Sequence, residues 1–176
     1  MPDTPHELIS LGYQARRNAQ PEQGKELFSK AVELSRAGPD PLALADSLVG
    51  LGQIDRDLKN NRIAIQHYRE AVDIYQRQPD RLRLAHTIRH LADILREDGS
   101  LEDARPHYEE ALRIYREHRA TPPLDLANTI RGLARLRAEA GETEEAKSLW
   151  QEARSLYESV NVQAGVKESD DQIARL

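Results

Sequence analysis

The sequence predicts an all-α protein, a right-handed α-solenoid of about four helix-turn-helix repeats with a C-terminal capping helix. The first observation is composition, because Phe and Trp occur once each while the helix formers Ala, Leu and Arg are abundant. The second is that one pattern of small, aliphatic and aromatic residues recurs at intervals of 40 and 42 residues. The third is a content of 39% hydrophobic and 31% charged residues, which suits a thin stack whose helices each keep a solvent face.

The recurring pattern is read by aligning the segments that begin at Leu42, Leu82 and Leu124. Its columns are an early Ala (Ala45, Ala85, Ala127), a Leu followed by a small residue (Leu51-Gly52, Leu91-Ala92, Leu133-Ala134), a turn residue (Lys59, Gly99, Gly141), an Ala (Ala64, Ala104, Ala146), an aromatic (Tyr68, Tyr108, Trp150), a second Ala (Ala71, Ala111, Ala153) and an aliphatic-Tyr pair (Ile74-Tyr75, Ile114-Tyr115, Leu156-Tyr157). Agreement at so many columns indicates repeated structural units.

The columns divide the chain, taken as a single domain over residues 1–176, into repeats at about 2–41, 42–81, 82–123 and 124–163. The first repeat is degenerate and keeps Leu11, Gly12, Phe28 and Ala31 in register. Residues 164–176 predict a polar capping helix, because Asp170 stands in a column that is aliphatic elsewhere.

Each repeat contains two stripes of apolar residues with helical spacing, which predicts a helix, a turn and a second helix. Asp40 before Pro41 reads as an N-cap followed by Pro at the first helical position, and Asn60 and Ser100 are expected to cap the second helices of their repeats. Pro106 lies inside one of these second helices, where we expect a local kink. Small residues should face the neighbouring helix, with the aromatic residue covering the gap.

These columns resemble the tetratricopeptide repeat, and the 40 to 42 residue spacing resembles the kinesin light chain variety. The stretches that carry the likeness are Leu126 to Ala134 and Ala111 to Arg116. The resemblance implies that the first helices of successive repeats line a concave groove that receives an extended peptide. It therefore implies a protein-protein interaction scaffold, although such repeats occur in proteins of very different roles.

The resemblance also selects the side chains that would line this groove. The expected groove residues are Tyr13, Gln53, His86, Arg89, His90, Asp93, Asn128, Arg131 and Arg135, with His6, Ile9, Asp46 and Val49 in the same columns. The arginines lie in the C-terminal half, where they would suit a carboxylate or phosphate. The alternative is that they belong to solvated helix faces balanced by Asp and Glu, and Asp93 could pair with Arg89.

Two more specific chemistries are not expected in this groove. The clamp by which some tetratricopeptide domains hold a chaperone's C-terminal carboxylate needs Lys and Asn where Ile9, Tyr13 and Gly50 stand. A zinc site at His86, His90 and Asp93 has helical spacing, but Arg89 beside it would repel a cation and no fourth ligand is identifiable. We therefore expect no metal and no cofactor.

Composition and motifs exclude several classes of function. A formal charge of −5 and a pI of about 5.7 argue against nucleic-acid and membrane-surface partners. No run is long and apolar enough to span a bilayer, and the first residues lack the features of a signal peptide, so we expect a cytoplasmic protein. No Gly-rich phosphate loop, HExxH or GxSxG motif occurs, so no enzyme is expected.

The sequence thus predicts a non-catalytic scaffold that binds another protein or peptide, with an acidic ligand as one option for its groove. The alternative is a structural module that assembles into a homo-oligomer and has no groove ligand.

Overall fold

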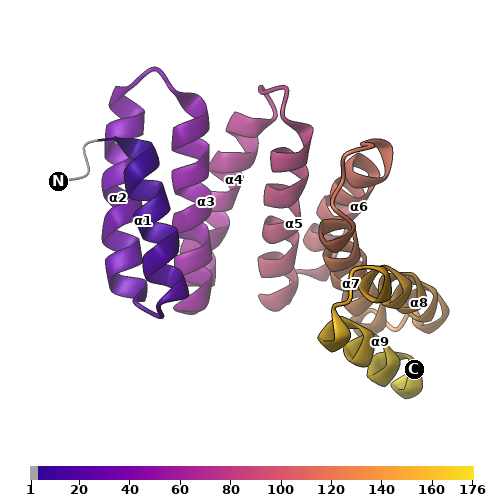
Figure 1. Cartoon of the computed structure of the whole chain (residues 1–176). Helices are drawn as coiled ribbons and strands as arrows, with labels where there is room; N and C mark the ends of the chain where they lie inside the picture. The colour runs from indigo at the N-terminus through magenta and orange to yellow at the C-terminus, as the bar shows by residue number, and fades with distance from the viewer. Residues whose placement is uncertain (1–3) are drawn as a thin grey trace. The chain divides into compact units, whose positions relative to one another are not determined.

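The computed structural model describes residues 4–176, which fold into nine α-helices without a strand among them (Figure 1). The helices are α1 (Pro5–Arg17), α2 (Pro21–Ala37), α3 (Pro41–Asp57), α4 (Asn61–Tyr75), α5 (Arg81–Glu97), α6 (Leu101–Glu117), α7 (Pro123–Glu139), α8 (Thr143–Ser159) and α9 (Gln163–Arg175). The predicted all-α class is confirmed. The expected start of the first repeat, at residue 2, lies outside the described residues.

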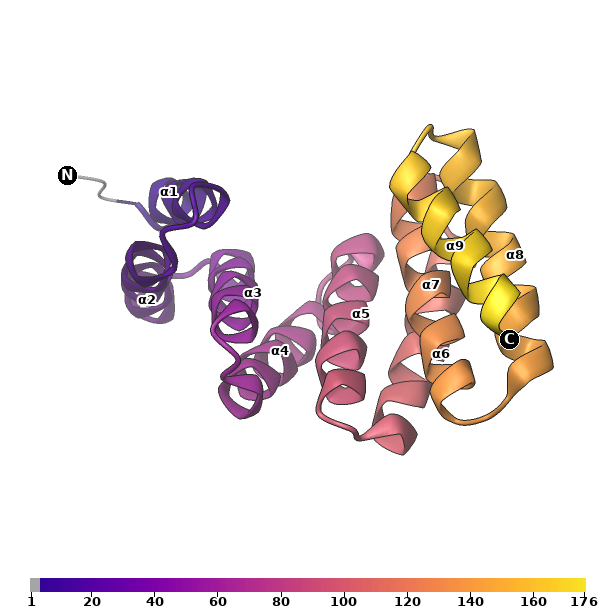
Figure 2. The ribbon, with the colours of Figure 1, turned by 90° about the horizontal axis from the view of Figure 1, so that it is seen from below.

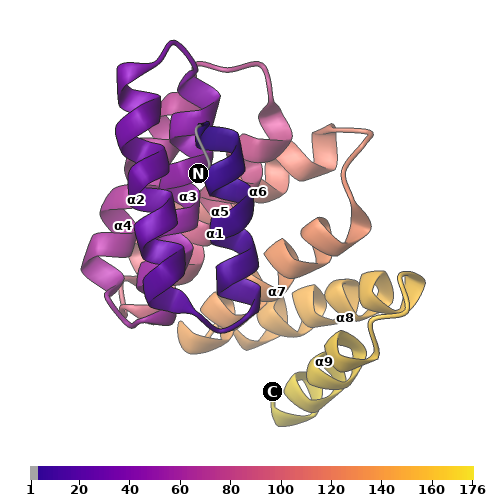
Figure 3. The ribbon, with the colours of Figure 1, turned by 60° about the vertical axis from the view of Figure 1, so that its left-hand side comes forward.

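The chain divides into two compact units, and the division falls between Arg81 and Leu82. In the first unit α1, α2 and α3 lie side by side, as Figure 2 shows almost along their axes, and α4 packs against α3. In the second unit α7 packs against α6 and α8, and α9 returns along α8 as a helical hairpin (Figure 3). The packed helix pairs therefore include α1 with α2 and α3 with α4 in the first unit, and α7 with α8 in the second.

Helices α1, α2, α3 and α7 begin with a proline, and two of these also have a side-chain cap. Thr4 and Glu7 form a capping box at the start of α1, and the Asp40 side chain accepts hydrogen bonds from the backbone N–H groups of Leu42 and Ala43 at 2.9 and 3.2 Å. Asn60 and Ser100 occupy N-cap positions, but neither side chain bonds the backbone there. Their expected capping role is therefore wrong, since the side chain of Asn60 turns to Asp55 instead.

The turn between the two helices of a repeat uses a left-handed residue each time. The φ angles are 56° at Ala19, 63° at Lys59, 83° at Gly99 and 78° at Gly141. Glycine adopts this conformation without a steric penalty, whereas Ala and Lys do not. The same backbone turn is thus built from glycine in the second unit and from residues with a Cβ atom in the first.

The helix seams are closed by aromatic rings that lie over glycines. A Cβ atom on Gly50 would lie 2.2 Å from the ring of Phe28, and one on Gly132 would lie 2.4 Å from the ring of Tyr108. Gly52 lies under Tyr68 with more room, since a Cβ atom there would be 2.9 Å from the ring. These contacts confirm the expected pairing of small and aromatic columns, and they require the helix backbones to approach closely.

A further repeated contact lies inside the first helices. Ser47, Thr87, Thr129 and Ser169 are all buried, and each hydroxyl donates to the backbone carbonyl four residues earlier, at 2.7 to 2.9 Å. This bond satisfies the buried hydroxyl within its own helix. Because Ser169 shares the contact, α9 is in register with α3, α5 and α7.

Helix α6 continues through Pro106, which lies on its exposed side. Water can reach the Glu102 carbonyl that lacks an N–H partner there. Separately, none of the helices formed by residues 4–176 is long and apolar enough to cross a membrane.

Candidate functional site

A set of polar side chains with hydrogen bonds and ion pairs among them, some buried and some reached by solvent, belongs to the second unit. It involves the first helices α5 and α7, the capping helix α9, and tyrosines of α6 and α8. Its members, which we call the polar cluster, are His86, Arg89, His90, Asp93, Tyr108, Tyr115, Asn128, Arg131, Arg135, Tyr157 and Glu168. Seven of these eleven residues were expected in the groove from the sequence.

The deepest part of the polar cluster is an ion pair on α5. The Arg89 Nη1 donates to Asp93 Oδ2 at 2.7 Å, and the Tyr108 hydroxyl donates to Asp93 Oδ1 at 2.6 Å. Arg89 is 7% exposed and Asp93 is 8% exposed. Both carboxylate oxygens of Asp93 are therefore satisfied, as a buried charge requires. Arg89 is a neutralised interior residue and does not present a free guanidinium in a groove.

Two histidines continue this chain of contacts. The Nε2 of His90 lies 2.9 Å from Arg89 Nη2 and 3.1 Å from the Nε2 of His86. Because a guanidinium only donates, His90 Nε2 accepts from Arg89, and the Nε2–H of His86 is then the second donor to it. Burial, with Arg89 second, lowers the pKa of His86, although Asp125 and Asp93 act in the opposite direction. A neutral pair of imidazoles follows.

The geometry argues against zinc at these histidines. The two Nε2 atoms share a hydrogen bond, and Asp93 is held by Arg89 and Tyr108. Throughout residues 4–176, no group of three or more His, Cys, Asp or Glu side chains is arranged to hold a metal ion.

In the second and fourth repeats the last tyrosine donates a hydrogen bond to the first helix of the same repeat. Tyr75 donates to Asp46, and Tyr157 donates to Asn128 at 2.8 Å. In the third repeat His86 occupies the acceptor column, and the buried hydroxyl of Tyr115 has no hydrogen-bond partner. Burial raises the pKa of Tyr115, with Asp125 acting in the same direction. His86 turns to His90 instead, so it does not accept from the Tyr115 hydroxyl.

The outer part of the polar cluster joins α7 to α9 through one carboxylate. Arg135 donates to Glu168 Oε1 from Nε at 3.1 Å and from Nη2 at 2.5 Å, and Arg131 Nη1 lies 3.5 Å from Oε2. The side chain of Arg131 is 34% exposed and that of Arg135 is 39% exposed. Two guanidinium groups thus converge on a single carboxylate at a place that solvent reaches.

The groove residues expected in the first unit are arranged differently. Tyr13 packs edge-on against Phe28 with 5.0 Å between ring centroids, and Gln53 is 8% exposed and accepts from Arg16 Nη1 at 3.0 Å. Ile9 and Val49 are buried in the core. Of the remaining expected residues, Asp46 accepts from Tyr75 as described above, and His6 is exposed near Asp40.

Sequence reasoning missed Glu168 and the roles of the tyrosines. Glu168 stands 40 residues after Asn128 and 82 after His86, in the column that also holds Asp46. Extending the register into α9 would have found it. The tyrosine column was recognised, but it was interpreted only as a packing seam.

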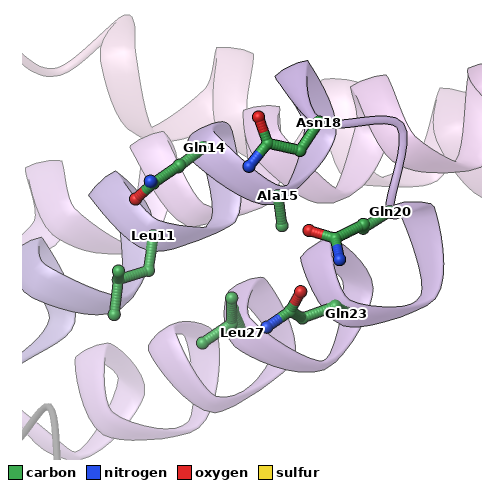
Figure 4. Close-up of a pocket in the computed structure, with 7 residues that line it drawn as sticks. All are labelled: Leu11, Gln14, Ala15, Asn18, Gln20, Gln23 and Leu27. Atoms are coloured by element: carbon green, nitrogen blue, oxygen red, sulfur yellow. The ribbon is translucent and has the colours of Figure 1, made fainter.

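A separate hollow of about 230 Å³ lies between α1 and α2 in the first unit (Figure 4). Four amide side chains, those of Gln14, Asn18, Gln20 and Gln23, surround it together with Leu11, Ala15 and Leu27. None of these seven residues is charged, and Leu11 is 39% exposed. The hollow therefore presents amide hydrogen-bonding groups beside apolar surface.

The sequence pattern of the tetratricopeptide repeat matches residues 7–77, 44–117 and 83–159 in three overlapping segments. The chain belongs to the tetratricopeptide repeat family. This agrees with the paired helices and with the small and aromatic seams described above. No match to the chain is found among curated proteins.

Solved structures that share the fold of this tetratricopeptide protein include three that match most of the chain. BtubC (BKLC) from P. vanneervenii has a TM-score of 0.81 at 21% identity, covering 89% of this chain and 64% of its own. A Rap protein in complex with competence and sporulation factor has a TM-score of 0.77 at 18% identity, with coverages of 91% and 44%. A kinesin light chain-like protein of Podosopora anserina, with nearly identical repeats, has a TM-score of 0.78 at 16% identity, covering 97% of this chain and 83% of its own. The chain thus spans less than two thirds of the first two proteins, and these likenesses concern the fold.

Proposed function

We propose that this tetratricopeptide chain is a non-catalytic scaffold that holds a peptide segment of a partner protein against the polar cluster of its second unit. The segment is acidic where it meets Arg131 and Arg135. The family supports the general role, since tetratricopeptide domains are typical protein-binding modules. The structural neighbour that holds competence and sporulation factor is consistent with a bound partner on this fold.

One observation carries the choice of surface. Arg131 and Arg135 both contact one carboxylate, that of Glu168, and their side chains are 34% and 39% exposed. Arg89 lies deeper and is neutralised by Asp93. A partner's carboxylate would add to a contact that solvent reaches and that has two guanidinium groups for one carboxylate.

A displayed random-peptide library tests this proposal. We expect the wild-type chain to enrich peptides that contain Asp or Glu, and the Arg131→Gln/Arg135→Gln variant to lose them by at least about tenfold in affinity. The matched control is Arg62→Gln/Arg69→Gln, which removes the same charge from exposed positions of α4. Equal binding by all three proteins, with folding verified by circular dichroism, would overturn the choice of site.

A second candidate function, self-association, is favoured by the hollow between α1 and α2. Amide groups both donate and accept hydrogen bonds, so a surface of amides and leucines is complementary to a two-fold copy of itself. Charged residues are depleted at interface cores, and the lining of the hollow has none although the chain is 31% charged. We propose that this face pairs two copies of the chain.

Sedimentation velocity over a range of concentrations tests the second candidate. Leu27→Arg should abolish a dimer that the wild type forms, because it places a charge at the centre of the interface. Ile63→Arg is the control, since Ile63 is 43% exposed on α4, away from the hollow. A wild-type monomer at all concentrations, or a dimer that survives Leu27→Arg, would contradict self-association through this face.

A further inference from the structure

We infer that Glu168 is an internal ligand of the Arg131–Arg135 pair, and that a carboxylate of the bound partner takes its place. This inference rests on the proposed function, because the same arginines are there assigned to the partner. It adds that the two guanidinium groups always contact a carboxylate. Glu168 of α9 supplies it in the absence of a partner, and the partner supplies it in the complex.

The contact has the geometry of a ligand bound to a receptor site. Two nitrogens of Arg135, Nε and Nη2, donate to Glu168 Oε1 at 3.1 and 2.5 Å. The Nη1 of Arg131 lies 3.5 Å from Glu168 Oε2. The two arginines come from adjacent turns of α7 and the carboxylate from α9, 33 and 37 residues later. An incoming Asp or Glu side chain could reproduce all three contacts.

Glu168 can leave without opening the core. Its side chain is 24% exposed, and rotation into water breaks its ion pairs with the two arginines. The fully buried residues of α9 are the small Gly165, which lies under the ring of Tyr157, and Ser169. A separate ion pair holds α9 against α8, because Arg154 Nε on α8 lies 2.6 Å from Asp170 Oδ1 on α9. Helix α9 can therefore remain docked while Glu168 is replaced.

The inner ion pair shows what a permanent partner looks like in the same unit. The Arg89 and Asp93 side chains are 8% and 11% exposed, and Tyr108 holds the second carboxylate oxygen. Breaking this pair would leave a buried charge, which is strongly unfavourable. Exposed pairs contribute little stability, so exchange of partners is confined to Arg131 and Arg135.

The experiment measures fluorescence polarisation with a labelled (Glu-Gly)₄ peptide and a (Gln-Gly)₄ peptide as the uncharged comparison. Glu168→Gln removes the internal carboxylate and should bind (Glu-Gly)₄ about tenfold more tightly than wild type, because the competitor is gone. Asp171→Asn is the matched control, since it removes one acid from an exposed position of α9 at the same cost in net charge and should change affinity less than twofold. Adding Arg131→Gln and Arg135→Gln to Glu168→Gln should abolish the gain.

Three outcomes would overturn the inference: no difference between wild type and Glu168→Gln, an equal gain in Asp171→Asn, or failure of (Glu-Gly)₄ to bind Glu168→Gln at all. The proposed function is judged separately by the peptide library. If Arg131→Gln/Arg135→Gln loses the library peptides while Glu168→Gln leaves their affinity unchanged, the arginines bind the partner and Glu168 does not compete.

Discussion

Helices α3 and α5 occupy the same place in successive repeats, yet their polar columns are filled in opposite ways. Where α3 has Val49 and Gly50, α5 has Arg89 and His90. In the first unit the column is closed by apolar packing, since Phe28 lies directly over Gly50. In the second unit the column carries an ion pair and hydrogen-bonded imidazoles. One backbone scaffold thus accepts either an apolar seam or a buried polar network, and we expect the two to respond differently to substitution.

The largest effect is expected at the ion pair of the second unit. Asp93→Ala leaves Arg89 buried without its carboxylate, which should cost about 3–5 kcal/mol of unfolding free energy. The replacement of both residues, Arg89→Leu/Asp93→Leu, should cost much less, because no charge remains uncompensated. Urea denaturation of the wild type and the two variants measures this. Equal losses in Asp93→Ala and in the double variant would contradict the buried-charge argument.

The corresponding test in the first unit is steric. Gly50→Ala places a Cβ atom where the Phe28 ring now lies and should destabilise by about 1–3 kcal/mol through overpacking. Gly38→Ala is the control, because the nearest atom to its new Cβ is 3.4 Å away. Thermal denaturation should lower the Tm of the first variant and leave the second almost unchanged. If both variants match the wild type, the seam is looser than its distances indicate.

Substitutions in the turns are expected to have smaller effects on stability, of opposite sign in the two units. Lys59→Gly relieves a left-handed residue with a side chain, at φ 63°, and should stabilise by roughly 0.5–1 kcal/mol. Gly99→Ala introduces that strain at φ 83° and should destabilise by a similar amount. Chemical denaturation of both variants measures the two changes in unfolding free energy. Changes of the same sign would show that something other than backbone strain dominates.

The smallest expected effect depends on pH. Burial lowers the pKa of His67 in the first unit and of His86 in the second. The unfolded chain then binds more protons, so stability is full above the ordinary pKa of about 6.5 and falls as pH drops toward the lowered values. His67→Gln/His86→Gln should therefore lose less stability than wild type between pH 7.5 and 5.5. A steeper loss in the variant would reverse the assigned sign.

What the sequence could predict follows the range of each contact. Repeats, helix pairs and small-aromatic seams were predictable because they leave a periodic pattern, and the Arg89–Asp93 pair was foreseen from its spacing on one helix. The bonds from Arg131 and Arg135 to Glu168 join helices more than thirty residues apart, and depend on how α9 packs. The left-handed turn at Ala19 was hidden because this residue is not glycine, whereas Lys59 was placed in a turn by its alignment with Gly99 and Gly141.

The buried hydroxyl bond shared by Ser47, Thr87, Thr129 and Ser169 also has a consequence for the engineering of the chain. It places α9 at the position in the repeat that α3, α5 and α7 occupy. In α9, Asp170 stands where the other three helices have an aliphatic residue. Replacing Asp170 by Ile and appending a second helix patterned on α8 is therefore a direct route to a lengthened array, since the register for the added helix already exists.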